Sequence, residues 1–197
     1  MAGKSREWIG RALFEGALIV VAVVLGFWVT EWQEQRRAEA AGQLALERIV
    51  AEIESNRGKI ARVLPYHEDI AAQLRALRRE PPEAPVVDTL FAIADQGIGD
   101  VLLYDEAWTT ALAQDALVPV AFEQVQMIAG VYNAAESGVS SSWRYLILQL
   151  GEKPSFMPDT DGSALKRLSF AYDNLASQER SLLRRYDQVL NALKDRP

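Results

Sequence analysis

The sequence predicts an all-α protein in which one N-terminal transmembrane helix continues into an extracytoplasmic helical bundle with long first and last helices. An apolar run occupies residues 12–29, and apolar residues spaced three and four apart form seams over residues 46–77 and 165–193. No segment alternates polar and apolar residues convincingly enough for a half-buried strand. The 197 residues suffice for one ordinary domain beyond the membrane.

Composition narrows the possible chemistry. Hydrophobic residues make up 49% and charged residues 24% of the chain, which is typical of a folded protein. The absence of cysteine excludes disulfides, thiolate zinc sites, iron-sulfur clusters and a cysteine nucleophile, and a single histidine, His67, excludes a His-rich metal site. The net charge of -6 disfavours nucleic-acid binding. We therefore expect no cofactor and no nucleic-acid partner.

The apolar run is predicted to span a membrane. Only Glu15 is ionisable within it, and eighteen helical residues cover about 27 Å, close to the thickness of a bilayer's hydrocarbon core. Trp8 and Trp28 are spaced as interfacial anchors at the two membrane surfaces, and Trp32 reinforces the outer one. A cleaved signal peptide is disfavoured because no small-x-small site directly follows the run, and the nearest such pattern, Ala38-Glu39-Ala40, lies beyond several charges. A buried helix of a soluble domain is the remaining alternative.

The basic residues around the run predict its orientation. Three precede it and two follow it: Lys4, Arg6 and Arg11, then Arg36 and Arg37. The positive-inside rule then favours a short cytoplasmic tail over residues 1–11, a transmembrane helix over 12–32 and a periplasmic helical domain over 33–197. The expected location is the bacterial inner membrane, with the lipid bilayer as one partner.

Four residues within the span are predicted to contact a partner helix. Ala22 and Gly26 form a small-xxx-small pair, and Gly16 adds a second flat position where another helix can approach closely. Glu15 is an ionisable residue that usually faces protein or water inside a membrane. Two alternatives stay open: small residues are common in spans, and Glu15 can pair with Arg11 four residues earlier.

The first seam begins soon after the span. It is expected to contain Leu46, Ile49, Ile53, Asn56, Ile60, Val63, His67, Ile70, Leu74 and Leu77. His67 is interpreted as a polar seam residue rather than a haem ligand paired with Met127 or Met157. Pro65 predicts a kink or restart near Leu64. The proline-rich residues 80–85 are expected to end the helix as a linker.

Shorter helices and a final long helix are expected after the linker. Their ranges are 88–96 with Asp88 as the cap and Gly97 at the end, 105–114, 119–136 and 140–150, followed by a loop over 151–161. The last seam contains Leu165, Leu168, Tyr172, Leu175, Glu179, Leu182, Tyr186, Val189 and Leu193. This last helix is the natural antiparallel partner of the first.

The middle of the chain is acidic. Residues 81–160 contain two basic and eleven acidic side chains, a local charge of -9. Such a segment can orient a basic partner outside the membrane. Neighbouring carboxylates such as Asp105 and Glu106 are interpreted as caps and surface residues, and no nucleophile elbow or phosphate-binding loop is present.

Parts of the sequence resemble a family of uncharacterised bacterial proteins. The resemblance rests on Glu15 followed by GALIVVAVVLGFWVTEW, on QEQRR and AEIESNRGKI after it, and more weakly on AWTTALAQDALVPV leading to VYNAA. It covers roughly residues 10–135, and Thr30-Glu31 replaces the Asn or Asp usual before the tryptophan. The family implies a single span with a helical extracytoplasmic domain, and it implies no chemistry.

Together these features predict a non-enzymatic, single-span accessory or structural subunit. Its transmembrane helix and helical domain would pack against the other subunits of a larger membrane complex. The alternative is a self-associating, membrane-anchored periplasmic bundle, sensor-like or a scaffold, that binds a ligand or an envelope partner.

Overall fold

The computed structural model describes residues 3–79, 83–157, 159 and 162–194, with the backbone alone for residues 3–15 and 17. The described residues are 83% helical and form no strand, so the predicted all-α class is confirmed. The helices are α1 (Gly3–Leu77), α2 (Val86–Ile93), α3 (Glu106–Ala113), α4 (Phe122–Ala134), the π-helix η1 (Ala135–Ser140), α5 (Ser141–Gly151), the 3-10 helix η2 (Lys153–Phe156) and α6 (Ser163–Lys194).

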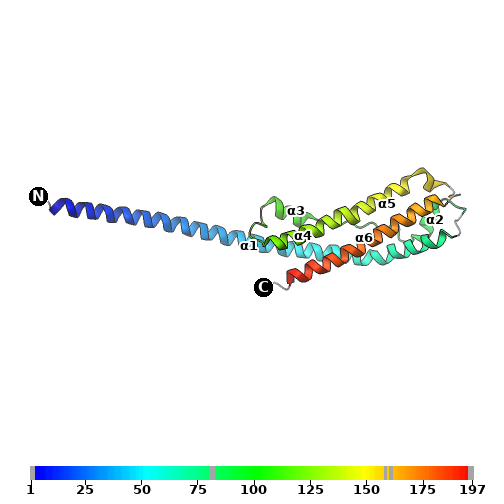
Figure 1. Cartoon of the computed structure of the whole chain (residues 1–197), viewed down its shortest axis with the longest axis horizontal. Coiled ribbons are helices and arrows are strands. Elements are labelled where there is room, and N and C mark those ends of the chain that lie inside the picture. Colours follow the sequence, from blue (N-terminus) through cyan, green and yellow to red (C-terminus); the bar gives the residue numbers. More distant parts are fainter. Residues whose placement is uncertain (1–2, 80–82, 158, 160–161, 195–197) are drawn as a thin grey trace.

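Three long helical rods make the bundle. The second half of α1 packs along α6, and α4, η1 and α5 together form the third rod beside them (Figure 1). The first half of α1 extends out of the bundle, and α6 brings the chain back to the end where α1 enters (Figure 1). The prediction that the N-terminal helix continues into the first bundle helix is confirmed, because α1 runs without a break from residue 3 to residue 77.

The two predicted seams face each other in the core. On α1 the fully buried members are Ile49, Ile53, Asn56, Ile60, His67, Ile70 and Leu74. On α6 they are Leu165, Leu168, Tyr172, Leu175, Glu179, Leu182 and Tyr186. The three-four spacing places each set on one face of its helix, so joining the two faces removes both from water.

Ion pairs record the antiparallel register of α1 and α6. As the residue number increases along α1, the number of the paired residue on α6 decreases. Glu54 pairs with Lys194, Arg57 with Asp187, Glu68 with Arg180 and Arg75 with Asp173. All eight side chains are more than a third exposed, where one pair contributes roughly 0–1 kcal/mol. The pairs therefore favour one register more than they stabilise the bundle.

Of the kink or restart expected near Leu64, the restart does not occur, because α1 continues through Pro65 without a break. Proline removes one backbone hydrogen bond and crowds the preceding turn, at a cost of about 3 kcal/mol. Ile60 and His67 on either side of the proline are fully buried in the core. Packing on both sides holds the backbone helical across this position.

The predicted gap between the helices 119–136 and 140–150 is also wrong. The π-helix η1 joins α4 to α5, so the chain is helical from residue 122 to residue 151. Gly138 sits in η1, and a Cβ built there would lie 2.9 Å from Oε1 of Gln178 on α6. The end of the Gln178 side chain thus occupies the space beside the glycine, where η1 packs against α6.

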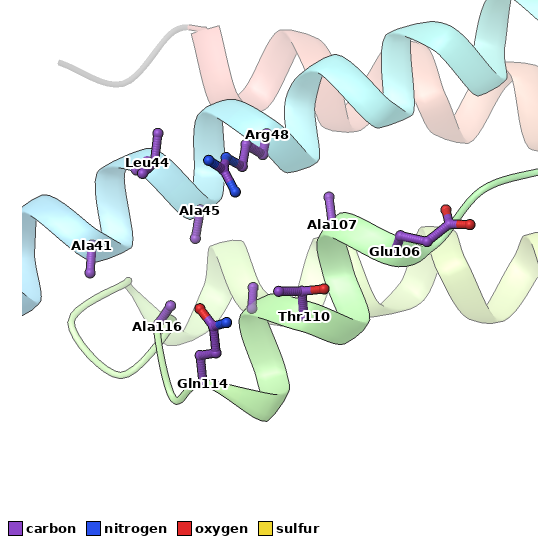
Figure 2. Close-up of a pocket in the computed structure, with 10 residues that line it drawn as sticks. Ala41, Leu44, Ala45, Arg48, Glu106, Ala107, Thr110, Gln114 and Ala116 are labelled. Carbon is purple, nitrogen blue, oxygen red and sulfur yellow. The ribbon is translucent and has the colours of Figure 1, made fainter.

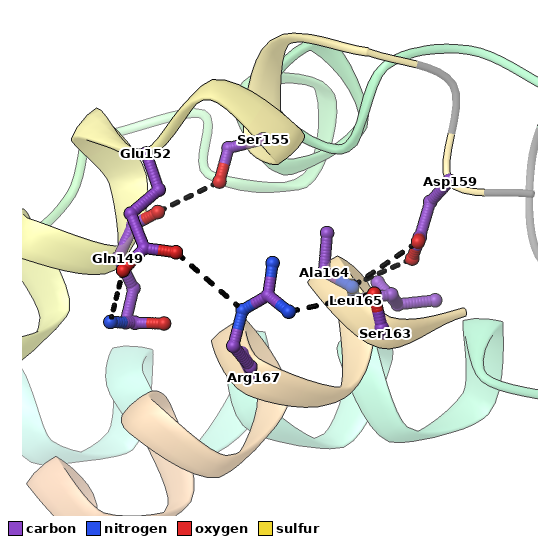
Figure 3. Close-up of polar contacts among 8 residues, drawn as sticks. All are labelled: Gln149, Glu152, Ser155, Asp159, Ser163, Ala164, Leu165 and Arg167. Carbon is purple, nitrogen blue, oxygen red and sulfur yellow. Dashed lines mark hydrogen bonds and ion pairs between the residues drawn. The ribbon is translucent and has the colours of Figure 1, made fainter. Parts of the chain in front are cut away.

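Smaller corrections concern the helix ends. Pro85, not Asp88, is the residue preceding α2, and the expected loop 151–161 includes the helix η2. Asp159 caps α6: its carboxylate accepts the backbone N–H groups of Ala164 at 3.2 Å and Leu165 at 2.8 Å (Figure 3). The Ser155 hydroxyl donates to the Gln149 carbonyl at 2.7 Å and ties η2 to α5 (Figure 3).

Two polar side chains of α1 hold the segment that leads into α3. The Asn56 amide donates to the Tyr104 carbonyl at 2.7 Å and accepts the Tyr104 N–H at 3.0 Å. The Glu52 carboxylate accepts the N–H of Ala107 at 2.9 Å and the hydroxyl of Tyr132 at 2.6 Å. One helix of the core thereby positions both the segment before α3 and the start of that helix.

We predict that Leu175→Asp unfolds the bundle or destabilises it by more than about 3 kcal/mol. Leu175 is 1% exposed on the seam of α6, and the substitution removes apolar burial and leaves a charge without a partner. Ser177→Asp introduces the same charge two residues away at an exposed position and serves as the control. Thermal unfolding followed by circular dichroism compares them, and equal melting curves would contradict the seam.

We also predict that the bundle loses stability above pH 10. Burial, and then the Glu52 carboxylate, raise the pKa of Tyr132 above its ordinary 10.0, and burial raises the pKa values of Tyr172 and Tyr186. The unfolded chain therefore releases these protons first, so the free energy of unfolding falls by up to about 1.4 kcal/mol per pH unit for each tyrosine. Denaturant titrations at several pH values should show a shallower decline for Tyr132→Phe.

Candidate functional site

The part of α1 outside the bundle is uncovered on every side. Every described side chain from residue 18 to residue 41 is exposed. Residues 18–29 contain no polar side chain, and a helix turns more than three times over that length. We call residues 18–32 the exposed apolar segment. A helix that is apolar all round belongs in a buried or lipid environment.

The predicted contact residues lie on this uncovered part. Gly16, Ala22 and Gly26 are exposed, and no heavy atom outside the helix lies within 4 Å of a Cβ built at either glycine. The structure therefore brings no second element of this chain to them. Glu15 lies outside the residues whose side chains are described.

The predicted interfacial anchors lie at the end of the segment nearer the bundle. Trp28 is 69% exposed, and Trp32 is 51% exposed with the Arg36 guanidinium 4.7 Å from its ring centre. Trp8 lies outside the residues whose side chains are described. An aromatic ring with a cation over it has one apolar and one polar side, as residues at a membrane surface do.

Among the residues that the structure describes, no helix is long and apolar enough to cross a membrane. The structure thus does not support the transmembrane helix predicted over residues 12–32. Residues 12–15 and 17 of that range lie outside the described side chains.

A groove of about 320 Å³ lies where α1 enters the bundle. Figure 2 shows α1 and α3 forming its two sides, with Ala41 and Ala45 facing Ala107 and Thr110. Longer side chains also line it: Leu44, Arg48, Glu106 and Gln114. A Cβ built at Gly42 would lie 2.8 Å from Cγ of Pro119. A larger residue at position 42 would therefore clash with the segment before α4.

A second cavity, of about 350 Å³, lies farther along the bundle beside His67. Five parts of the chain surround it: α1, the segment 99–105, η1, α5 and α6. The polar side chains that line it are His67, Asp100, Asp105, Glu136, Ser140, Arg144 and Glu179. We call this space the His67 cavity.

A buried histidine-glutamate pair forms its inner wall. The Nδ1 of His67 lies 2.9 Å from Oε1 and 3.0 Å from Oε2 of Glu179, and both side chains are 1% exposed. The other ring nitrogen, Nε2, is buried and has no hydrogen-bond partner among the described residues. When Nδ1–H donates to the carboxylate of Glu179, Nε2 of the neutral ring is an acceptor without a donor.

Aromatic rings and one glycine surround the histidine. Trp143 stacks on it with ring centres 6.2 Å apart, and Tyr172 meets it edge-on at 6.0 Å. A Cβ built at Gly99 would lie 2.3 Å from Nε2. Gly99 also has a φ of +77°, a conformation that favours glycine, and its lack of a side chain lets its backbone pack directly against this nitrogen.

The cavity was only partly foreseeable. His67 and Glu179 both occupy predicted seam positions, and the buried, polar seam role of His67 is confirmed. Two polar residues on facing seams of antiparallel helices are a signal for pairing that sequence reasoning missed. It also missed η1, whose residues Glu136, Val139 and Ser140 reach the cavity.

The described residues contain no group of three or more acidic, histidine or cysteine side chains placed to hold a metal ion. Comparisons of the chain with family models, with curated proteins and with solved structures found no match. The resemblance to a bacterial single-span family stays a prediction.

Proposed function

We propose that the chain is a non-enzymatic accessory subunit of a larger bacterial membrane complex, anchored by residues 12–32. The exposed apolar segment carries this proposal. Its eleven large apolar side chains include Phe27 and Trp28, which are 73% and 69% exposed. Leaving them in water forgoes roughly 1 kcal/mol each, on the order of 10 kcal/mol in total. An exposed apolar surface of this size is typical of a site that contacts lipid or another protein.

A lipid bilayer fits this surface better than a single soluble partner. A partner helix covers one face, whereas the residues from Leu18 to Leu25 are apolar on all faces. The run over residues 12–29 matches the hydrocarbon thickness, and the Trp28 and Trp32 rings suit its outer surface. The basic residues favour a cytoplasmic tail and a periplasmic bundle.

A partner helix within the membrane would bind at the small residues. Gly16 and Gly26 leave open space beside the helix, and Ala22 lies one turn before Gly26. Glu15 supplies the polar group that such a contact would neutralise. The family resemblance supports the same topology.

The bundle offers a second contact surface. Ten of the eleven acidic residues in 81–160 are exposed, the exception being the cap Asp159. A basic surface of another subunit fits this segment, with a contact that weakens at high salt. A non-enzymatic role is proposed because the sequence carries no nucleophile elbow, no cysteine and one histidine.

The topology has a direct test. A reporter that is active only in the periplasm, fused after Pro197, should be active, and a cytoplasmic reporter at the same place should be silent. The fusion should stay in the membrane fraction after an alkaline carbonate wash. Activity of the cytoplasmic reporter would overturn the orientation, and release by carbonate would overturn the anchor.

The partner contact is tested with Gly26→Leu. The larger side chain blocks close helix approach, so we expect at least a several-fold loss of co-purifying subunits in mild detergent. Val24→Leu is the control, because at about 100° per residue it lies on nearly the opposite face. The melting curve of the bundle should be unchanged in both.

Three other results are informative in the same experiment. Co-purification at the level of the unsubstituted protein with both variants would show that the segment only anchors the bundle. The partner contact would then be sought in residues 81–160. Loss with both variants would show a general packing effect. A homo-oligomer without other chains, found by mass determination, would support the self-associating alternative.

A further inference from the structure

The α3–α4 turn, residues 112–122, holds large apolar side chains out of the bundle. Val118 is 79% exposed, Phe122 at the start of α4 is 73% exposed, and Leu112 at the end of α3 is 49% exposed. Leu117, next to Val118, is buried in the core. The core therefore accounts for one apolar residue of the turn and leaves the exposed ones without a role in folding.

Backbone hydrogen bonds hold the α3–α4 turn in one shape. The N–H of Ala116 donates to the carbonyl of Ala111 at 3.0 Å. The N–H of Asp115 donates to the carbonyl of Leu112 at 3.3 Å, and Asp115 has a φ of 52°. These features form the Schellman motif that ends many helices. The N–H of Val118 in turn donates to the Asp115 carbonyl at 3.2 Å, so the exposure of Val118 belongs to a fixed turn.

The α3–α4 turn lies at the end of the bundle from which the exposed apolar segment extends. A Cβ built at Gly42 would lie 2.8 Å from Cγ of Pro119 and 3.2 Å from the carbonyl oxygen of Ala116. Figure 2 shows Ala116 beside Ala41 of α1. Gly42 follows Trp32 by ten residues, about 15 Å of helix. The turn is thus the part of the bundle that lies nearest to the proposed membrane.

The chemistry of the turn fits a surface without net charge. Residues 116–122 contain no charged side chain, and residues 83–143 contain no lysine, arginine or histidine. Asp115 and Glu123 flank the uncharged stretch, and both are exposed. A negatively charged surface would be repelled by these two carboxylates at close range. Zwitterionic lipid offers apolar contact without that repulsion.

We propose that the α3–α4 turn rests on the membrane that holds the exposed apolar segment, with Val118 and Phe122 among zwitterionic lipid headgroups. This inference rests on the proposed anchoring of residues 12–32. It adds a second lipid contact, which makes the bundle lean toward the membrane on its α3 side.

The geometry of α1 allows this contact. Transmembrane helices tilt by about 20° on average and by up to about 40°. Because α1 is unbroken from residue 3 to residue 77, a tilt of its N-terminal part also tilts the bundle. With helix axes about 10 Å apart, a tilt of about 30° lowers the turn from about 15 Å to about 8 Å beyond Trp32. A headgroup layer roughly 5–8 Å deep then meets it.

The absence of cysteine allows the contact to be tested with single labels. Val118→Cys, Phe27→Cys and Leu148→Cys each take one environment-sensitive fluorophore at a position that is 79%, 73% or 67% exposed. Phe27 reports on the anchor, and Leu148 on α5, toward the opposite end of the bundle, is the control (Figure 1). Full-length protein is reconstituted into dioleoylphosphatidylcholine vesicles with or without a nitroxide on the headgroup. The nitroxide should quench position 118 several-fold more than position 148.

The label at position 27 separates failure of this inference from failure of the anchor. Quenching at 27 without quenching at 118 would show an anchored bundle that stands clear of the lipid, and would overturn the lipid contact alone. A blue shift at 118 without quenching would indicate a protein contact, such as a second copy, and would also overturn it. Equal quenching at 118 and 148 would contradict a specific contact. Protein that neither floats with the vesicles nor is quenched at 27 would overturn the anchor itself.

A pair of charge substitutions adds a second readout with the label at Val118→Cys. Phe122→Asp adds a third carboxylate to the turn, and Phe91→Asp adds the same charge at a 58% exposed position on α2. The first should lower quenching at 118 and the second should leave it unchanged. Mixing phosphatidylglycerol into the vesicles should also lower it, because Asp115 and Glu123 repel an anionic surface. Equal effects of the two substitutions, or stronger quenching with phosphatidylglycerol, would contradict the proposed contact.

Discussion

The antiparallel packing of α1 against α6 is the constraint on which the rest of this molecule depends. Each helix alone presents a continuous seam of large side chains, from Ile49 to Leu74 on one and from Leu165 to Tyr186 on the other. Each seam is buried mainly against the other, and α4, η1 and α5 cover the rest of the core. Joining them also overcomes the local cost of Pro65, which alone would interrupt α1.

The pair of His67 and Glu179 lies within that apolar seam. Removing two ionisable groups from water is expensive, and apolar residues of similar volume could pack there at less cost. Such pairs are better suited to selecting one arrangement than to adding stability. With Nδ1 facing both carboxylate oxygens, a slip of α6 by one turn would leave both groups buried and unpaired.

The same helix organises the cavity and the surface. Glu52 and Asn56 fix the start of α3 and the segment before it, while Tyr66 donates to the Gly97 carbonyl at 2.6 Å. These bonds hold residues 97–105 against His67. Because α1 is unbroken from residue 3 to residue 77, whatever covers its exposed apolar segment also sets the direction in which the bundle projects.

Sequence alone determined the helical class, both long seams, the burial of His67 and the continuation of the N-terminal helix into the bundle. These features follow from the spacing of apolar residues along the chain, because residues three and four positions apart lie on the same face of a helix. Tertiary structure decided what spacing does not encode. Pro65 stays helical because buried residues on both sides of it pack in the core, η1 joins α4 to α5 where the chain packs against α6, and His67 meets Glu179 across 112 positions of sequence. Partners that distant are chosen by how the helices pack, and no local pattern carries that information.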